Sequence, residues 1–199
     1  MTRTAALPAE EAMRADFYGF LAGFLARPPG AERLAQASAL TGDDGPMGQA
    51  IADLAARAGT TSPEAAAREF NALFIGLGRG ELLPYASVYL TGFLNEKPLA
   101  SLRRDMATHD MRRADDIFEP EDNIASLCDM MAALIEGRFA DPAPLAEQGQ
   151  FFTRHLAPWA GHFFDDLEHA KGAALYAPVG RIGRIFVDIE KEAFRLGGA

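Results

Sequence analysis

Apolar residues recur at helical spacing along almost the whole chain. Between residues 13 and 25 they stand three and four positions apart, so that all of them fall on one face of a helix. The residues of this face are Met13, Phe17, Phe20, Leu21, Phe24 and Leu25. Pro28 and Pro29 follow, and they end the predicted helix because proline has no backbone N–H to donate.

The same spacing predicts helices through the rest of the chain. They cover residues 31–40, 47–58, 63–74, 84–94, 99–108, 142–156, 158–171 and 178–195. The clearest helix is expected to begin at Pro120, ahead of a long apolar stripe that runs from Ile124 to Ile135. Alternating β-branched residues do not run long enough for a strand. We therefore predict an all-α fold, a single globular helical domain of about eight to ten helices.

A charged and less apolar stretch interrupts this pattern from His109 to Phe118. It predicts a hinge loop before Glu119 and Pro120. The loop, residues 109–118, would separate an N-terminal helical part, residues 1–108, from a C-terminal helical part, residues 119–199, within one compact domain overall. Hydrophobic residues make up 49% of the 199 positions, which is enough to bury a sizeable core.

The charge balance narrows the choice of partners. The formal net charge is -9, so the surface repels nucleic acid and anionic lipid and attracts basic partners. The most apolar early stretch, residues 17–26, has roughly half the length that a membrane span needs. The first residues also lack the long apolar stretch of a secretory signal. We expect a cytoplasmic protein with no nucleic-acid partner and no stable membrane insertion.

Motifs for catalysis are weak. Cys128 is the single cysteine, and its place on the apolar stripe after Pro120 favours a buried structural thiol. The sequence contains no Gly-x-Ser-x-Gly nucleophile motif. Gly76 to Gly80 lacks the Gly-Lys-Ser/Thr ending of a phosphate loop, so a flexible loop is preferred there. We expect no enzyme, no catalytic residues and no cofactor.

Histidines and carboxylates gather in one predicted helix near the C-terminus. They are His162, Asp165, Asp166, Glu168 and His169. A di-metal site in a helical bundle uses Glu-x-x-His pairs, and this sequence has none. A solvent-exposed charged face is therefore the preferred interpretation, and no metal site is expected. A small enzyme or metal protein built on this cluster stays open as an alternative.

Two segments are harder to explain as core alone. In the first, Tyr85 and Tyr89 stand four apart in a predicted helix with Ser87 between them, so the two rings would share a face. They either pack in the core or form a binding surface. The second segment, residues 119–123, places three carboxylates at the predicted start of the Pro120 helix. They either complement the helix dipole or receive an arginine.

At these two segments the chain resembles the TorD/DmsD/NarJ family of redox-enzyme maturation chaperones. The Glu-Pro-x-Asp stretch of that family, before a long apolar helix, corresponds to residues 119–122. Its Leu-Phe-x-Gly element corresponds to residues 73–76, and its Pro-aromatic-x-Ser-x-aromatic element to residues 84–89. The order and spacing match, and the likeness covers about residues 10–195. The family usually has histidine at position 123, and Asn123 can form hydrogen bonds there but cannot become cationic.

The resemblance implies an all-α chaperone that binds the precursor subunit of a molybdoenzyme and its twin-arginine leader peptide. It also implies that export is held back until the cofactor is inserted. The signal-peptide-binding residues that it implies are Phe70, Leu73, Phe74, Pro84, Tyr85, Ser87, Tyr89, Glu119, Asp122 and Asn123. Members of the family exchange segments across the hinge, so either a monomer or a domain-swapped homodimer is expected. The alternative is a generic helical assembly or adaptor protein that binds a mature redox-enzyme subunit without reading its leader.

Overall fold

The computed structural model describes residues 7–76, 80–113 and 119–197, and in these ranges the regular structure is helical. The first elements are α1 (Ala9–Leu25), α2 (Ala31–Ser38), α3 (Pro46–Ala58), α4 (Pro63–Phe70) and a single π-helical turn, η1 (Asn71–Ile75). They are followed by α5 (Ala86–Thr91), α6 (Lys97–Thr108), α7 (Ile124–Glu136), α8 (Leu145–His155), α9 (Ala160–His169) and α10 (Tyr176–Gly197). The all-α prediction is confirmed.

Local sequence signals account for several helix ends. Ser62 accepts the backbone N–H of Ala65 through its hydroxyl at 3.2 Å, and Pro63 takes the first position of α4. Gly92 ends α5 and Gly137 ends α7, each with a positive φ that glycine adopts without strain. These signals are local, so the sequence alone located these ends to within a few residues.

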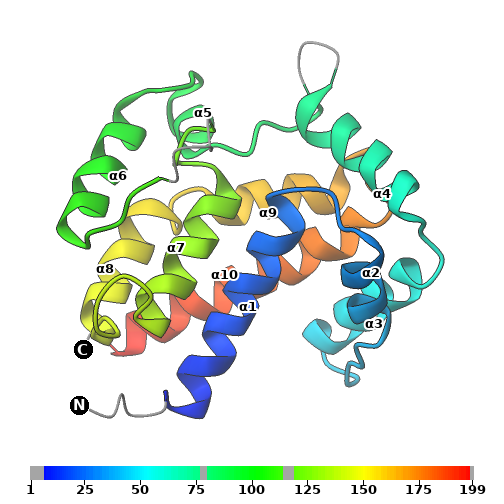
Figure 1. Cartoon of the computed structure of the whole chain (residues 1–199), viewed down its shortest axis with the longest axis horizontal. Coiled ribbons are helices and arrows are strands. Elements are labelled where there is room, and N and C mark those ends of the chain that lie inside the picture. Colours follow the sequence, from blue (N-terminus) through cyan, green and yellow to red (C-terminus); the bar gives the residue numbers. More distant parts are fainter. Residues whose placement is uncertain (1–6, 77–79, 114–118, 198–199) are drawn as a thin grey trace.

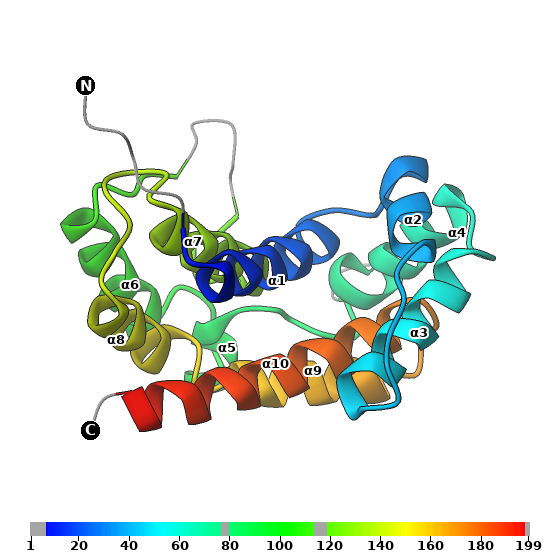
Figure 2. The ribbon, with the colours of Figure 1, turned by 90° about the horizontal axis from the view of Figure 1, so that it is seen from below.

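Helix α10 extends across most of the molecule with α9 beside it, and α1 crosses the direction of α10 at an angle (Figure 1). Helices α2 to α4 gather at one end, and α5, α6 and α8 lie toward the other. Seen from below, α9 and α10 make one layer and α1 with α7 the other (Figure 2). The main pairs of packed helices are α1 with α7, α9 with α10, and α3 with α10.

Aromatic side chains fill the space between these layers. Tyr18 and Phe24 of α1 and Phe163 of α9 are fully buried, as is Trp159, which precedes α9. Gly183 allows α10 to lie close to α9, because a Cβ atom at that position would come within 2.3 Å of the Phe164 ring. Cys128 is also buried, as its position on the apolar stripe predicts, and burial raises the pKa of its thiol.

A buried ion pair joins α1 to α10 inside the core. Arg14 binds Glu190 through two parallel hydrogen bonds of 2.8 Å, and the Tyr18 hydroxyl donates to the same carboxylate at 2.8 Å. Arg14 also donates to Gln148 of α8 at 2.9 Å and to a second carboxylate, that of Glu11, at 2.8 Å. Because the charges are paired and hydrogen-bonded, their burial is tolerated, and the network fixes how three helices meet.

The predicted hinge lies only partly in the described structure. Residues 109–113 follow α6 without forming a helix, whereas residues 114–118 lie outside the described residues, as do residues 77–79 of the glycine-rich loop. Helix α1 packs along α7, so the two predicted parts of the chain share one core. The division at this loop stays a prediction. None of the described helices combines the length and the hydropathy that spanning a membrane would require.

Candidate functional site

The tyrosine segment and the acidic segment lie next to each other. Tyr85 and Asn123 form an isolated antiparallel β-bridge. On its two sides, Ala86 donates its backbone N–H to the Asp122 carbonyl at 3.0 Å, and Ile124 donates to the Pro84 carbonyl at 2.9 Å. The two stretches that carry the family resemblance therefore meet in space, although the hinge loop and α6 separate them in sequence.

This pairing overturns the expected start of the Pro120 helix. Helix α7 begins at Ile124, and Asn123 caps it by accepting the Ala125 backbone N–H at 2.9 Å. The backbone of Asp122 and Asn123 is paired with residues 84–86, so these two residues do not continue the helix toward Pro120. The prediction that acids occupy the first turn of this helix was wrong, because Glu119, Glu121 and Asp122 all precede its cap. Asn123 thus forms a hydrogen bond within the protein, while a hydrogen-bonding role toward a leader stays a prediction.

Asp122 is the most deeply placed of the three acids, with 1% of its surface exposed. Its Oδ2 atom accepts the backbone N–H of Ser87 at 2.7 Å, which holds the first turn of α5. Neither Oδ1 of Asp122 nor the Ser87 hydroxyl finds a hydrogen-bond partner among the described residues. A buried carboxylate oxygen in this state is energetically costly, so it marks a point where a donor from outside would be stabilised.

The other two acids have partners within the protein. Arg103 donates to Glu121 at 2.8 Å and 3.1 Å, and Arg113 lies 3.8 Å from the same carboxylate. Burial disfavours ionisation of Glu121, but the hydrogen bonds from Arg103 outweigh it and hold the pKa of this carboxyl below its usual value. Glu119 is exposed and accepts the Tyr85 hydroxyl. Burial, and then Glu119, raise the pKa of the Tyr85 phenol.

The two tyrosines do not share a helical face, contrary to the prediction. Tyr85 is in extended backbone just before α5, because its bridge to Asn123 requires that conformation. Tyr89 lies within α5 and packs against Trp159, with ring centroids 5.3 Å apart, while its hydroxyl donates to Asp166 at 2.8 Å. Burial and then the Asp166 carboxylate raise the pKa of Tyr89. The Tyr89 ring therefore packs on the core, and its hydroxyl lies at the surface.

The apolar half of the expected surface is largely core. Phe70 and Leu73 are buried, and Phe70 and the half-buried Phe74 pack edge-on to one another with ring centroids 5.0 Å apart. Both rings also pack on Tyr176. Pro84 is buried as well. The resemblance implies ten binding residues. These four of them lie mainly beneath the surface, where they can support a binding surface but contribute little to it directly.

Sequence reasoning missed three exposed apolar residues beside the site. Leu90, Phe93 and Leu94 lie in and just after α5, and their side chains reach solvent. Leu90 also lines a cavity of about 110 Å³ between α5, α6, α7 and α8, to which Asp122 contributes. The sequence does carry a signal for them, since three large apolar residues cluster around Gly92, where the helical pattern ends.

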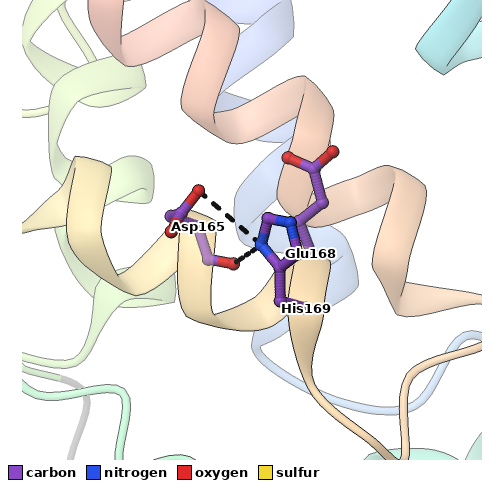
Figure 3. Close-up of side chains that lie close together, drawn as sticks. All are labelled: Asp165, Glu168 and His169. Carbon is purple, nitrogen blue, oxygen red and sulfur yellow. Dashed lines mark hydrogen bonds and ion pairs between the residues drawn. The ribbon is translucent and has the colours of Figure 1, made fainter.

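The charged cluster of α9 behaves as a surface network. His169 donates through Nδ1 to the Asp165 carbonyl at 2.9 Å and lies 3.7 Å from its carboxylate (Figure 3). Glu168 faces the same group, but its carboxylate binds Arg184 at 2.9 Å. Arg184 also lies 3.7 Å from Asp165. A metal ion among these three residues would have to compete with a guanidinium, so the charged-face interpretation accounts for them.

Comparison with known proteins agrees with the fold and with the two matched segments. Residues 41–165 match the family model described as nitrate reductase delta subunit. The chaperone protein TorD of Vibrio cholerae is 31% identical over 132 residues, which are 63% of this chain and 60% of that protein. TorD of Vibrio atlanticus is 30% identical over 132 residues, covering 62% and 61%. The chain thus matches about 60% of the length of these curated relatives.

A solved structure shares the fold over nearly its whole length. It is the crystal structure of a protein from Archaeoglobus fulgidus assigned to redox enzyme maturation, with a TM-score of 0.61 and 19% identity. The match covers 94% of this chain and 99% of that one. Together with the family match over more than half of the sequence, the fold leads to one assignment: this chain belongs to the nitrate reductase delta subunit family, which includes the TorD and NarJ chaperones.

Proposed function

We propose that this protein is a cytoplasmic chaperone for the maturation of a redox enzyme. In this role it binds the twin-arginine leader peptide, the apo form of a molybdoenzyme subunit, or both, and it holds the precursor back from export until the cofactor is inserted. No chemical step is required of the chaperone itself. The names of the relatives, which are chaperones, support the general role, and the geometry of the candidate site supports the reading of a leader.

One observation carries the proposal. The bridge between Tyr85 and Asn123 places acidic and aromatic side chains at one point, as recognition of a basic and apolar peptide requires. Glu119 and the Tyr85 hydroxyl lie at the accessible side of this point, and Asp122 lies beneath them. A desolvated arginine–carboxylate hydrogen bond contributes about 1.5–3 kcal/mol, so a few such bonds with apolar contacts would give micromolar affinity.

The ten residues carried over from the family would then have different roles. Glu119, Tyr85 and Asn123 are at least partly exposed and would contact the leader directly. Ser87 and Pro84 are buried and would hold the bridge and the first turn of α5 in place. The buried Phe70 and Leu73, with Phe74 and Tyr89, would support these segments from the core. Asp122 both holds α5 and keeps one oxygen available.

Isothermal titration calorimetry with synthetic leaders tests the proposal. The panel consists of the twin-arginine leaders encoded in the same genome, each with a counterpart in which both arginines are lysine. We expect one leader to bind with micromolar or tighter affinity and its lysine counterpart to bind more weakly, because only arginine offers the planar fork for a carboxylate. If no leader binds while a leaderless subunit is still captured, the protein is an adaptor for the mature subunit instead.

A further inference from the structure

The turn after α5 presents apolar side chains to solvent in a fixed geometry. Phe93 is 71% exposed, and Leu90 and Leu94 are 43% and 45% exposed. Thr91 fixes the turn by donating its hydroxyl to the Ser87 carbonyl at 2.7 Å and accepting the Phe93 backbone N–H at 3.3 Å. Figure 1 shows this connection between α5 and α6 at the edge of the molecule. Exposed phenylalanine on a hydrogen-bonded turn is typical of a contact surface.

This apolar surface borders the cavity that contains Asp122. The cavity walls are mainly apolar and come from Ala86, Leu90, Pro98, Leu102 and Leu127. At about 110 Å³ the cavity is far smaller than a site for a drug-sized ligand, and it suits the head group of one side chain. Asp122 is among the residues that line it, and the buried Oδ1 atom of this residue lacks a donor among the described residues.

The basic side chains that line the cavity, Arg154 and His155, are directed at a different acid. Arg154 donates to Asp105 Oδ2 at 2.6 Å, and the Nε2 atom of His155 lies 2.7 Å from the same oxygen. Within the described residues, Asp122 therefore has hydrogen bonds from backbone but no ion pair. A buried carboxylate without a counter-charge favours a cationic partner, since pairing offsets the cost of its desolvation.

We propose that Leu90, Phe93 and Leu94 form the apolar part of the leader-binding surface, and that the adjacent Asp122 cavity takes one arginine or lysine side chain of the leader. This inference rests on the proposed function. The apolar stem of the basic side chain would lie along Leu90 and Pro98, with its charged tip at Asp122. The neighbouring apolar residues of the leader would cover Phe93 and Leu94. This assignment replaces Phe70 and Leu73, whose side chains are already packed in the core.

Fluorescence anisotropy with a labelled peptide tests this surface. The probe is a fluorescein-labelled twin-arginine leader from the same genome that binds the unaltered protein. Phe93→Ser should weaken binding by about tenfold, as loss of a central aromatic contact does. Leu196→Ser is the matched control, because Leu196 is similarly exposed near the end of α10, and it should bind within about twofold of the unaltered protein. Circular dichroism checks that both variants fold.

The charged half of the proposal has its own test. Asp122→Asn keeps the shape of the side chain and an oxygen that can accept from Ser87, but it removes the charge. It should weaken binding of the arginine leader by about tenfold and should matter little for a leader with citrulline, the neutral isostere, at both arginine positions. Equal losses for both leaders would show that no basic side chain is read at Asp122.

The outcomes separate this inference from the proposed function. If the unaltered protein binds a leader while Phe93→Ser binds it equally well, the apolar surface lies elsewhere and the inference is wrong. If no leader binds to the unaltered protein, the proposed function fails first. An independent measurement is a Phe93→Cys variant carrying an environment-sensitive dye. Cys128 is buried and its thiol pKa is raised, so labelling would be selective, and leader binding should shift the emission to the blue.

Discussion

Asp122 accepts the backbone N–H of Ser87 at 2.7 Å, so a carboxylate just before α7 holds the first turn of α5. Helix α5 has six residues, which is too few for a stable helix in isolation. Its position therefore depends on this hydrogen bond and on the bridge between Tyr85 and Asn123. Tyr89, Leu90 and the exposed turn that follows are placed by the same contact.

Replacing Asp122 by alanine should destabilise the protein by about 1–3 kcal/mol, because the Ser87 N–H loses its buried acceptor. The helical circular dichroism at low temperature should stay close to that of the unaltered protein, since α5 contributes little to it. Urea denaturation measures the change in the free energy of unfolding. Asp122→Asn should cost less, and unchanged stability in Asp122→Ala would mean that the hydrogen bond does not hold α5.

Breaking the buried ion pair between Arg14 and Glu190 is expected to lower the stability of the protein further. Glu190→Gln should destabilise the protein by about 2–3 kcal/mol, because the buried Arg14 guanidinium loses the more deeply buried of its two counter-charges and keeps only Glu11, at 2.8 Å. Thermal unfolding followed by circular dichroism measures the effect. Glu192→Gln is the control on the same helix, where the carboxylate pairs with Arg195 at 2.6 Å on the exposed surface. That change should have no measurable effect, and similar losses in both variants would contradict the role assigned to Glu190.

Two glycines in helices should respond to alanine in opposite directions. A Cβ atom at Gly180 would lie 2.4 Å from the Glu168 backbone nitrogen and 2.8 Å from the Phe164 carbonyl oxygen. Neither backbone atom can move freely, so Gly180→Ala should destabilise by about 2 kcal/mol. A Cβ atom at Gly19 in α1 meets nothing within 4 Å, so Gly19→Ala should stabilise by about 0.5–1 kcal/mol. Denaturant melts of the two variants measure both changes in the free energy of unfolding.

Stability should fall as the pH is lowered through the range in which His155 is titrated. Burial lowers the pKa of His155; Asp105 opposes this shift and Arg154 adds to it. The folded protein therefore disfavours the proton that the unfolded chain takes up below about pH 6.5. This contribution is present above that pH and is lost as the pH falls toward the lowered pKa. Urea melts at pH 8 and pH 5.5 should show the difference.

The carboxyl of Asp105 does not account for a fall in stability between pH 8 and pH 5.5. Burial raises its pKa, but the hydrogen bonds from His155 and Arg154 prevail and the pKa lies below its usual value. Its contribution is therefore lost only under more acidic conditions, below about pH 4. His155→Gln should reduce the fall in stability between pH 8 and pH 5.5, whereas substitution of the exposed His162 should not. An unchanged pH dependence in His155→Gln would assign the effect to other groups.

Helical periodicity predicted most elements because it depends on local burial, as in α1 and α10. The start of the Pro120 helix was wrong because non-local hydrogen bonds from residues 84–86 compete for the same backbone. Asn123, which stands directly before the apolar stripe, is a better helix start by the rules of capping. Both starts are compatible with the residue types, and the tertiary pairing decides between them.

The location of the candidate site could be predicted from the sequence, but which of its side chains are buried and which are exposed could not. The matched segments meet, as expected, yet residue type does not distinguish an aromatic in the core from one at a surface. Phe70 packs on Tyr176, while Phe93 is exposed on a turn. Which of three neighbouring acids retains an unoccupied oxygen depends on Arg103 and Ser87, which come from distant parts of the sequence.

The packing of α1 along α7, together with the bridge at Asn123, has a consequence for any dimer formed by exchange of residues 119–197. Each of these contacts, and the Arg103–Glu121 pair, would then join two different chains. Separating such chains would expose the apolar stripe of α7 to water, so dissociation would be as slow as unfolding. Exchanged dimers and monomers would then elute from a column as two stable species whose ratio does not respond to dilution.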